Sequence, residues 1–300
     1  MPTETVATKT KGIPKQKRKE SSFINISKRL LKNRLAVAGL IIIAIQIFLA
    51  VFAGWVTEYD PTKQSLANAE LPPGSPEHWL GTDNYGRDLW SRLVFGARIS
   101  LLVGFTTVIL GLIGGVILGL VSGYYPKLDG IVMRIMDLMF AFPGILLAML
   151  IIAILGTSLV NVVIAISIWS IPTCARIVRG SVLSIKKQEY IMAMKSLGAN
   201  DFRILFKHVL PNCMAPIIVF ATMQIATSVL STSALSFIGL GAQPPTPEWG
   251  AMISEGLKYM FTAPHLVIIP GIAIMLVVFA FNVVGDGLRD ALDPNMNLDK

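Results

Sequence analysis

Few residues of this chain have the types and spacing that catalysis or metal binding requires. The three histidines, at positions 78, 208 and 265, are scattered, and no nucleophile–base pair or set of metal ligands can be recognised. Cys174 and Cys213 are too few for a disulfide framework and are poorly placed for a zinc site. A Gly-x-x-x-x-Gly-Lys-Ser/Thr phosphate loop is also missing from the sequence. We therefore expect neither an enzyme nor a bound cofactor or metal in this chain.

The residues best suited to act on a solute are hydroxyl and amide side chains in an otherwise apolar stretch. Gln224, Thr227, Ser228 and Ser231 follow the i, i+3, i+4, i+7 spacing of one helix face. Polar groups at membrane depth must meet water or another helix. The spacing predicts a face that lines a translocation pathway. The alternative is that the Ser and Thr hydroxyls donate to carbonyls of their own helix.

Membrane-spanning helices are needed to position these side chains, and the composition predicts them. Of the 300 residues, 53% are hydrophobic and 15% are charged, whereas a soluble domain carries roughly 25% charged residues. The mean hydropathy is +0.65. Windows of about 18 or more residues without charge predict an all-α membrane protein with six transmembrane helices. They lie at 35–57, at 99–126, on either side of 156–158 within 138–175, at 216–240 and at 259–285.

The net charge of +8 indicates orientation, because Lys and Arg gather in cytoplasmic loops. With both termini in the cytoplasm, 21 of the 26 Lys and Arg residues lie inside and 5 lie outside. This bias makes nucleic acid an unnecessary explanation for the charge. A cleaved signal peptide is the alternative for the first helix, but the long basic segment before it disfavours cleavage.

The predicted spans divide the chain into five segments. Residues 1–34 form a basic cytoplasmic arm, which is either an amphipathic helix on the lipid surface or a disordered tail. The first transmembrane helix follows at 35–57, and 58–98 is an extracytoplasmic loop. Residues 99–286 form a five-helix core that contains a cytoplasmic loop at 176–212. Residues 287–300 are a cytoplasmic tail.

Glycines spaced four apart in the second predicted span form a smooth groove on one helix face. Such a stripe lets another helix approach at backbone distance, either as static packing, which we favour, or as an interface with a moving partner. The four residues are Gly111, Gly115, Gly119 and Gly123.

Two local ion pairs are also predicted from spacing. Asp88 and Arg92 lie four residues apart at the start of the second span. Asp137, at the edge of the third span, is costly there unless it is paired, and Arg134 lies three residues earlier on the same face.

The cytoplasmic loop at 176–212 reads as a helix, a break and a second helix. Gly198 can end the first helix, and Asn200 or Asp201 can begin the next. Apolar Ile191, together with residues 194 and 197, shares one face of the first helix. A short exposed helix of this kind is suited to docking a soluble partner.

With these motifs in place, the chain resembles the inner-membrane permease subunits of ABC importers, specifically the shorter permease of the dipeptide/oligopeptide/nickel branch. The family's loop signature places Gly198 and Leu210-Pro211 at matching positions, although its Glu-Ala-Ala is Met192-Ala193-Met194 here. Four further motifs occur in the family's order along nearly the whole chain. They are Gly81-Thr82-Asp83 with Gly86-Arg87-Asp88, Phe140-Ala141-Phe142-Pro143, Leu235-Ser236-Phe237-Ile238-Gly239-Leu240-Gly241, and Gln243 to Gly250.

The resemblance implies a type I ABC importer permease fold in the cytoplasmic membrane of a bacterium or archaeon. It further implies a second homologous permease, two cytoplasmic ATPase subunits that hold ATP and Mg²⁺, and an extracytoplasmic substrate-binding protein. The cargo would be a dipeptide, an oligopeptide, glutathione or a nickel chelate. A secondary, ion-coupled transporter is the alternative, although no inverted repeat or mid-membrane acid is evident. The residues implied to couple to the ATPase are Glu189, Tyr190, Ala193, Met194, Leu197, Gly198, Ala199 and Asp201.

Overall fold

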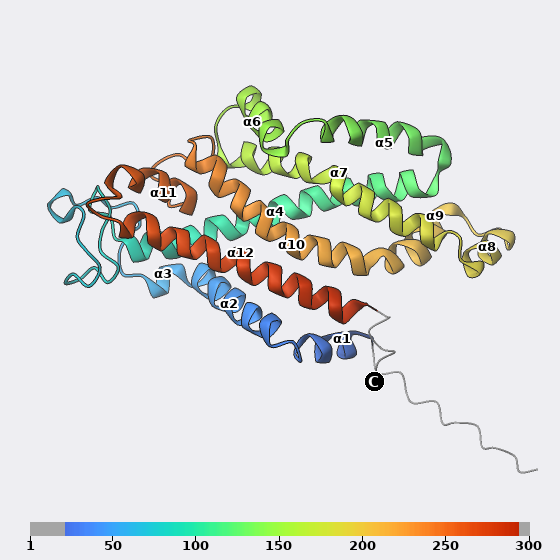
Figure 1. The fold of residues 1–300 in the computed structure, drawn as a ribbon, viewed down its shortest axis with the longest axis horizontal. Helices are drawn as coiled ribbons and strands as arrows, with labels where there is room; N and C mark the ends of the chain where they lie inside the picture. The colour runs from blue at the N-terminus through green and yellow to red at the C-terminus, as the bar shows by residue number, and fades with distance from the viewer. Residues whose placement is uncertain (1–21, 294–300) are drawn as a thin grey trace, which may run out of the picture.

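The computed structural model is an elongated helical bundle, and it describes residues 22–293 (Figure 1). The expected basic segment 1–21 and the end of the tail, 294–300, lie outside the described residues. Within the described part, five helices are long and apolar enough to cross a membrane, and one bent pair supplies a sixth span. This confirms the predicted helical class. No strand forms in the described part, which contains only two isolated β-bridges.

The N-terminal helices lie close to the positions that the sequence predicts, but the first predicted span is broken. A short helix, α1 (Ser22–Leu30), precedes α2 (Arg34–Val51), whose first amides at 35 and 36 are capped by the Asn33 side chain. The span then breaks at Phe52 before the single turn α3 (Ala53–Val56). The outer loop that follows contains one 3₁₀ turn, η1 (Leu66–Asn68).

Helix α4 (Leu89–Tyr124) begins ten residues before the predicted start at 99. Its N-cap is Asp88, whose carboxylate accepts a hydrogen bond of 2.7 Å from the amide of Ser91. The prediction stopped at the charges near this end, because an isolated Arg is costly in a span. The early start is possible because the first Arg of the helix, Arg92, lies among carboxylates.

The third span is broken, which the sequence analysis did not predict. Helix α5 (Pro126–Phe140) and helix α6 (Gly144–Leu155) meet at an angle of 89°. Pro143 lies in the break, where its ring cannot continue the helix of α5. Residues 127–137, expected in a cytoplasmic loop, are therefore helical. The predicted turn at 156–158 does separate α6 from α7 (Leu159–Ile185).

The two ends of the bundle carry different short elements (Figure 1). At one end, α8 (Glu189–Ser196), α9 (Asp201–Ile204) and a π-helical turn, η2 (Leu205–Val209), lead into α10 (Leu210–Phe237). At the other end, α11 (Trp249–Gly256) and a 3₁₀ turn, η3 (Leu257–Tyr259), precede α12 (His265–Leu292). Helix α12 thus extends into the segment expected to be a tail from 287.

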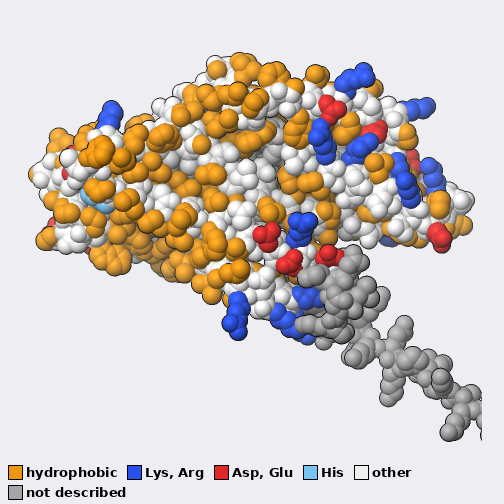
Figure 2. Space-filling view, in the orientation of Figure 1, with side chains coloured by type: hydrophobic (Ala, Val, Ile, Leu, Met, Phe, Trp, Pro, Cys, Tyr) orange, Lys and Arg blue, Asp and Glu red, His pale blue; other side chains and the backbone are white. Residues whose placement is uncertain are grey.

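The distribution of side chains fits the predicted orientation. Hydrophobic side chains cover much of the visible face, and Lys and Arg gather toward the half that carries α8 and α9 (Figure 2). That half is therefore the cytoplasmic end, and α11 with the 58–88 loop lies at the extracytoplasmic end. Buried apolar clusters join α4, α10 and α12 near the outer end and α4, α7 and α10 near the inner end.

Candidate functional site

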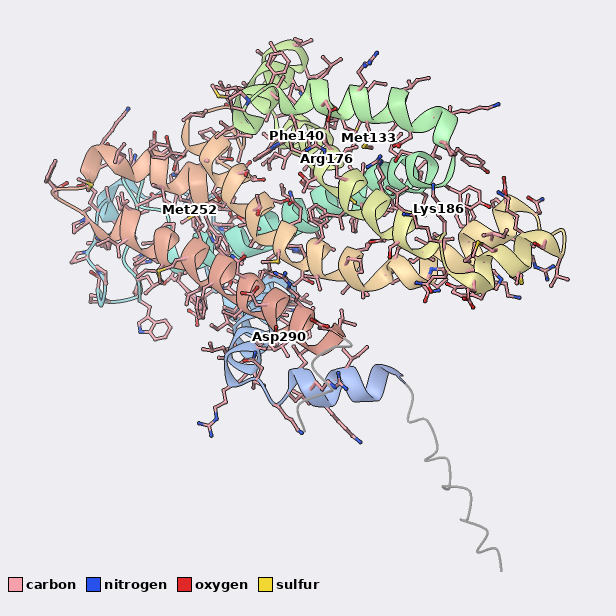
Figure 3. All side chains as sticks on the ribbon, turned by 45° about the vertical axis from the view of Figure 1, so that its right-hand side comes forward. Met133, Phe140, Arg176, Lys186, Met252 and Asp290 are labelled. Atoms are coloured by element: carbon pink, nitrogen blue, oxygen red, sulfur yellow. The ribbon has the colours of Figure 1, made fainter. Side chains whose placement is uncertain are left out.

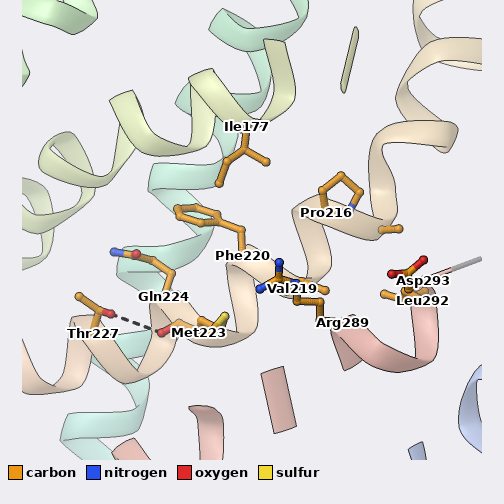
Figure 4. Close-up of a pocket in the computed structure, with 11 residues that line it drawn as sticks. Ile177, Pro216, Val219, Phe220, Met223, Gln224, Thr227, Arg289, Leu292 and Asp293 are labelled. Carbon is orange, nitrogen blue, oxygen red and sulfur yellow. Dashed lines mark hydrogen bonds between the residues drawn. The ribbon is translucent and has the colours of Figure 1, made fainter. Parts of the chain in front are cut away.

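A cavity of about 660 Å³ lies between α7, α10 and α12 (Figure 4). Most of its lining is apolar, and α10 supplies the amide of Gln224 and the hydroxyl of Thr227. Near the cytoplasmic end of α12, Arg289 and Asp293 also line it. The remaining lining residues are Ile177, Ala215, Pro216, Val219, Phe220, Met223 and Leu292. A mainly apolar cavity with a few polar groups suits a small solute.

The four residues of the predicted polar stripe are not equivalent. Gln224 and Thr227 line the cavity, and the Thr227 hydroxyl also donates to the carbonyl of Met223 at 3.4 Å. Ser231 is half-buried. Ser228 is fully buried, and its Oγ has no hydrogen-bond partner within residues 22–293. The structure therefore brings two of the four residues to one cavity and turns Ser228 into the bundle.

The glycine stripe of α4 packs against α7 along its whole length. A Cβ placed on Gly115 would lie 2.4 Å from Cys174 Cβ, and one on Gly119 would lie 2.6 Å from Val178 Cβ. The remaining two glycines, Gly111 and Gly123, face Ser170 and Val182 in the same way. Four glycines on one helix thus meet four side chains spaced four apart on the other, so that α4 and α7 approach at backbone distance.

A network of buried ion pairs lies at the extracytoplasmic end. Arg87 donates to Asp83 and to Glu255, each at 2.6 Å. Arg92 lies 3.3 Å from Asp83 and 3.1 Å from Glu255. Both Arg residues are only 1% exposed. Two carboxylates therefore neutralise two guanidiniums and join the 58–88 loop to α4 and α11.

The predicted Asp88–Arg92 pair is wrong. Asp88 instead contacts His78 Nδ1 at 2.9 Å and caps α4 through its other oxygen. Both oxygens of Asp88 therefore have other partners, and Arg92 contacts Asp83 and Glu255. Local spacing allowed the pair, but Glu255, which lies 163 residues away, provides the actual partner.

At the cytoplasmic end, the predicted break between two short helices is present. Gly198 has a φ of +79°, and the Asn200 side chain caps α9 by accepting from the amide of Phe202 at 3.0 Å. Of the three apolar residues predicted to share a face of α8, Ile191 is buried and packs in the apolar cluster at the inner ends of α4, α7 and α10. Leu197 is 83% exposed. Residues Glu189, Tyr190, Ala193 and Gly198 are also exposed, and Met194, Ala199 and Asp201 are half-buried.

Two hydrogen bonds join elements at the cytoplasmic end. The Tyr124 hydroxyl at the end of α4 donates to Asp201 at 2.7 Å. Lys186 Nζ donates to the carbonyl of Gly123 at 2.7 Å. Burial raises the pKa of Tyr125, and the Asp201 carboxylate raises that pKa further. The first of these bonds links the start of α9 to α4, and the second links the end of α7 to α4.

Two Asp–Arg ion pairs join α5 to α7. Arg179 donates two hydrogen bonds, of 2.6 and 2.7 Å, to Asp129. Arg176 Nη2 lies 2.5 Å from Asp137 Oδ1. The predicted pairing of Asp137 with Arg134 is therefore wrong, because the bend after α5 brings this helix alongside the Arg residues of α7.

Sequence reasoning missed Glu255 and Arg289, and also Glu248, which caps α11 and accepts a hydrogen bond of 3.0 Å from Ser233. Glu248 lies within the Gln243 to Gly250 motif, but the spacing along the sequence gives neither acid a partner. An unpaired Arg87 beside a span was the signal that a distant carboxylate had to exist. No group of three metal-binding side chains occurs among residues 22–293, and both cysteines are buried free thiols.

Comparison with known families agrees with this architecture. Residues 96–298 match the family of binding-protein-dependent transport system inner membrane components. Residues 22–73 match the N-terminal transmembrane domain of oligopeptide transport permease C.

Curated relatives cover most of the chain. It is 51% identical over 270 residues to the dipeptide transport system permease protein DppC of Alkalihalophilus pseudofirmus, covering 90% of this chain and 88% of that protein. It is 47% identical over 270 residues to the glutathione transport system permease protein GsiD of Pectobacterium atrosepticum, covering 90% of each. The fold is similar to an inward-facing structure of the MetNI methionine ABC transporter, with a TM-score of 0.56, 21% identity, and coverage of 68% of this chain and 98% of that chain.

Proposed function

The chain belongs to the family of binding-protein-dependent transport system inner membrane components, as a permease subunit of an ATP-driven importer, and from this premise we propose that its cargo is a short peptide. Two of its relatives carry the names of dipeptide and glutathione permeases, and both names denote small peptides. The chain is a multi-pass protein of the cytoplasmic membrane and a transport component, not an enzyme. Its family requires an ATPase and a substrate-binding protein as partners.

The observation that supports coupling of this permease to an ATPase is the pair of short helices at the cytoplasmic end. Helix α8 and helix α9 project from the bundle, Leu197 between them is exposed, and Asp201 is bonded to α4. This arrangement supports docking of α8 and α9 in a groove of the partner ATPase. ATP and Mg²⁺ are then held by the ATPase subunits, and this chain supplies no cofactor.

The cavity between α7, α10 and α12 is one half of the proposed translocation pathway. Gln224 and Thr227 offer hydrogen bonds to peptide groups there (Figure 4). A second homologous permease would complete the pathway and form a heterodimer. The basic residues around α1 and the start of α2 support contact of the N-terminal arm with anionic lipid.

The docking role is tested at Gly198. Its φ of +79° is a conformation that β-branched residues rarely adopt, whereas Asn tolerates it. A Cβ at this position would meet nothing within 4 Å, so the effect of a substitution is on the backbone alone. We expect G198V to lose ATP-driven uptake and to retain less ATPase on purification, whereas the control G198N keeps both.

Unchanged uptake together with normal ATPase retention in G198V would show that the geometry of this break does not matter. Loss in both G198V and G198N would show that the glycine has another role, such as close contact with the partner.

A further inference from the structure

The cavity between α7, α10 and α12 carries its polar side chains at two levels. Gln224 and Thr227 lie far along α10 from its cytoplasmic end, and Arg289 and Asp293 lie at the cytoplasmic end of α12. The lining follows α10 from position 215 to position 227, a rise of about 18 Å at 1.5 Å per residue. An extended dipeptide spans about 7 Å. A short peptide therefore occupies only part of the cavity at a time, and it must pass Arg289 to reach the cytoplasm.

The guanidinium of Arg289 has no partner in the part of the chain that the structure describes. Among residues 22–293 it makes no hydrogen bond and no ion pair. Other Arg residues differ, because Arg87, Arg92 and Arg179 are each paired with a carboxylate. The donors of Arg289 are therefore available to a group that enters the cavity.

The surroundings of Arg289 leave its charge directed into the cavity. Figure 4 shows the guanidinium reaching from α12 toward α10, beside Val219. The next residue, Asp290, does not line the cavity, and Figure 3 shows it where α12 lies beside α1. Among the described residues of the lining, Arg289 is the one cation and Asp293 the one acid.

A guanidinium in this place is suited to a carboxylate. Its planar fork can donate two parallel hydrogen bonds to the two oxygens of one carboxylate. The mainly apolar lining strengthens this attraction relative to bulk water. Asp293, one turn farther along α12, bears the same charge as a carboxylate and limits the strength of the contact. A contact of limited strength suits a group that must release its ligand to the cytoplasm.

We propose that Arg289 binds the terminal carboxylate of a peptide as it passes the cytoplasmic end of the cavity. This inference rests on the proposed function, in which the cargo is a short peptide. A peptide with a free C-terminus carries this carboxylate whatever its side chains are, so that one guanidinium can serve peptides of different sequence. The ion pair forms and breaks without any covalent step.

The test uses the complete complex with the second permease and the ATPases, without the binding protein, in nanodiscs of zwitterionic lipid. Such lipid offers no anionic headgroup to compete for the guanidinium. The two probes are dialanine and dialanine amide, which differ only in the terminal carboxylate. Saturation-transfer-difference NMR gives the apparent Kd of each probe for wild type, R289Q and R289K. The matched control is R134Q, which removes an exposed Arg of α5 that does not line the cavity.

We expect wild type to bind dialanine about tenfold more tightly than dialanine amide. R289Q should weaken dialanine by about the same factor and leave dialanine amide unchanged, so that the two probes become equal. R289K keeps the charge but not the fork, so it should weaken dialanine by a smaller factor. R134Q should bind both probes as wild type does. If Arg289 served only to stabilise the end of α12, its replacement would affect both probes alike.

Equal affinity of wild type for the two probes would overturn the inference, as would unchanged binding of dialanine to R289Q. Equal weakening of both probes in R289Q, the same loss in R134Q, or no binding of dialanine to wild type would also overturn it. ATP-driven uptake of dialanine by wild type with its binding protein is measured in parallel. Uptake without carboxylate-dependent binding refutes the inference alone, and absence of uptake refutes the proposed function.

Discussion

Replacement of Gly119 by Ala should destabilise the protein, although Ala normally favours a helix. An added Cβ would lie 2.6 Å from Val178 Cβ and 2.7 Å from the carbonyl oxygen of Ala175. Carbon atoms in contact normally lie about 3.5–4.0 Å apart, so α7 must move away by about 1 Å. Overpacking of this kind costs about 1–3 kcal/mol. The packing of α4 against α7 would then be weakened at its middle.

Gly180 on α7 provides the matched control, because a Cβ there meets nothing within 4 Å. The gain in helix propensity, about 1 kcal/mol, applies to both G119A and G180A and cancels between them. The difference between the two variants therefore reports the overpacking alone. We expect the Tm of the purified complex to be lowest for G119A and highest for G180A. Equal Tm values would refute the interpretation that the glycine stripe is a close-packed interface.

Two further predictions concern the outer end and the pathway. E255Q leaves buried Arg87 and Arg92 with one carboxylate, so it should lower the free energy of unfolding by about 3–5 kcal/mol. The control E58Q, at an exposed acid, should change it by about 0.5 kcal/mol or less. Thermal unfolding compares the two variants, and equal stabilities would contradict the prediction. A charged thiol reagent should modify T227C at least about tenfold faster than S228C during turnover. The reason is that Thr227 lines the cavity and Ser228 is buried. Equal rates would show that the two positions share one environment.

Features that depend on local periodicity were predictable from the sequence. The apolar windows found the spans, and the four-residue spacing of glycines identified one face of α4. The break at Gly198 followed from residue types that favour a left-handed φ and a helix cap. Each of these depends on residues within a few turns of one another, which a single sequence displays directly.

Features that depend on distant partners were not predictable. The sequence suggested Arg134 for Asp137 and Asp88 for Arg92, because those residues lie one turn away. The bend at Pro143 instead places α5 beside α7, and the fold brings Glu255 to Arg92 from 163 residues away. Charges that seem misplaced beside a span therefore identify where a partner is required, but not which residue provides it.

The same limit explains the polar stripe on α10. Residue spacing placed Ser228 on the same face as Gln224 and Thr227, but a stripe of this width covers both the cavity wall and the helix contact behind it. Ser228 is fully buried and does not line the cavity. The candidate pathway is consequently narrower than the sequence suggested.

The most direct test of the account is uptake of labelled dialanine into proteoliposomes that contain this chain, the second permease and the ATPases, with the binding protein added outside. The account predicts accumulation that requires both internal ATP and the binding protein and that is lost in G198V. Accumulation driven by an ion gradient in the absence of ATP would contradict it, because the energy would then not enter through α8 and α9.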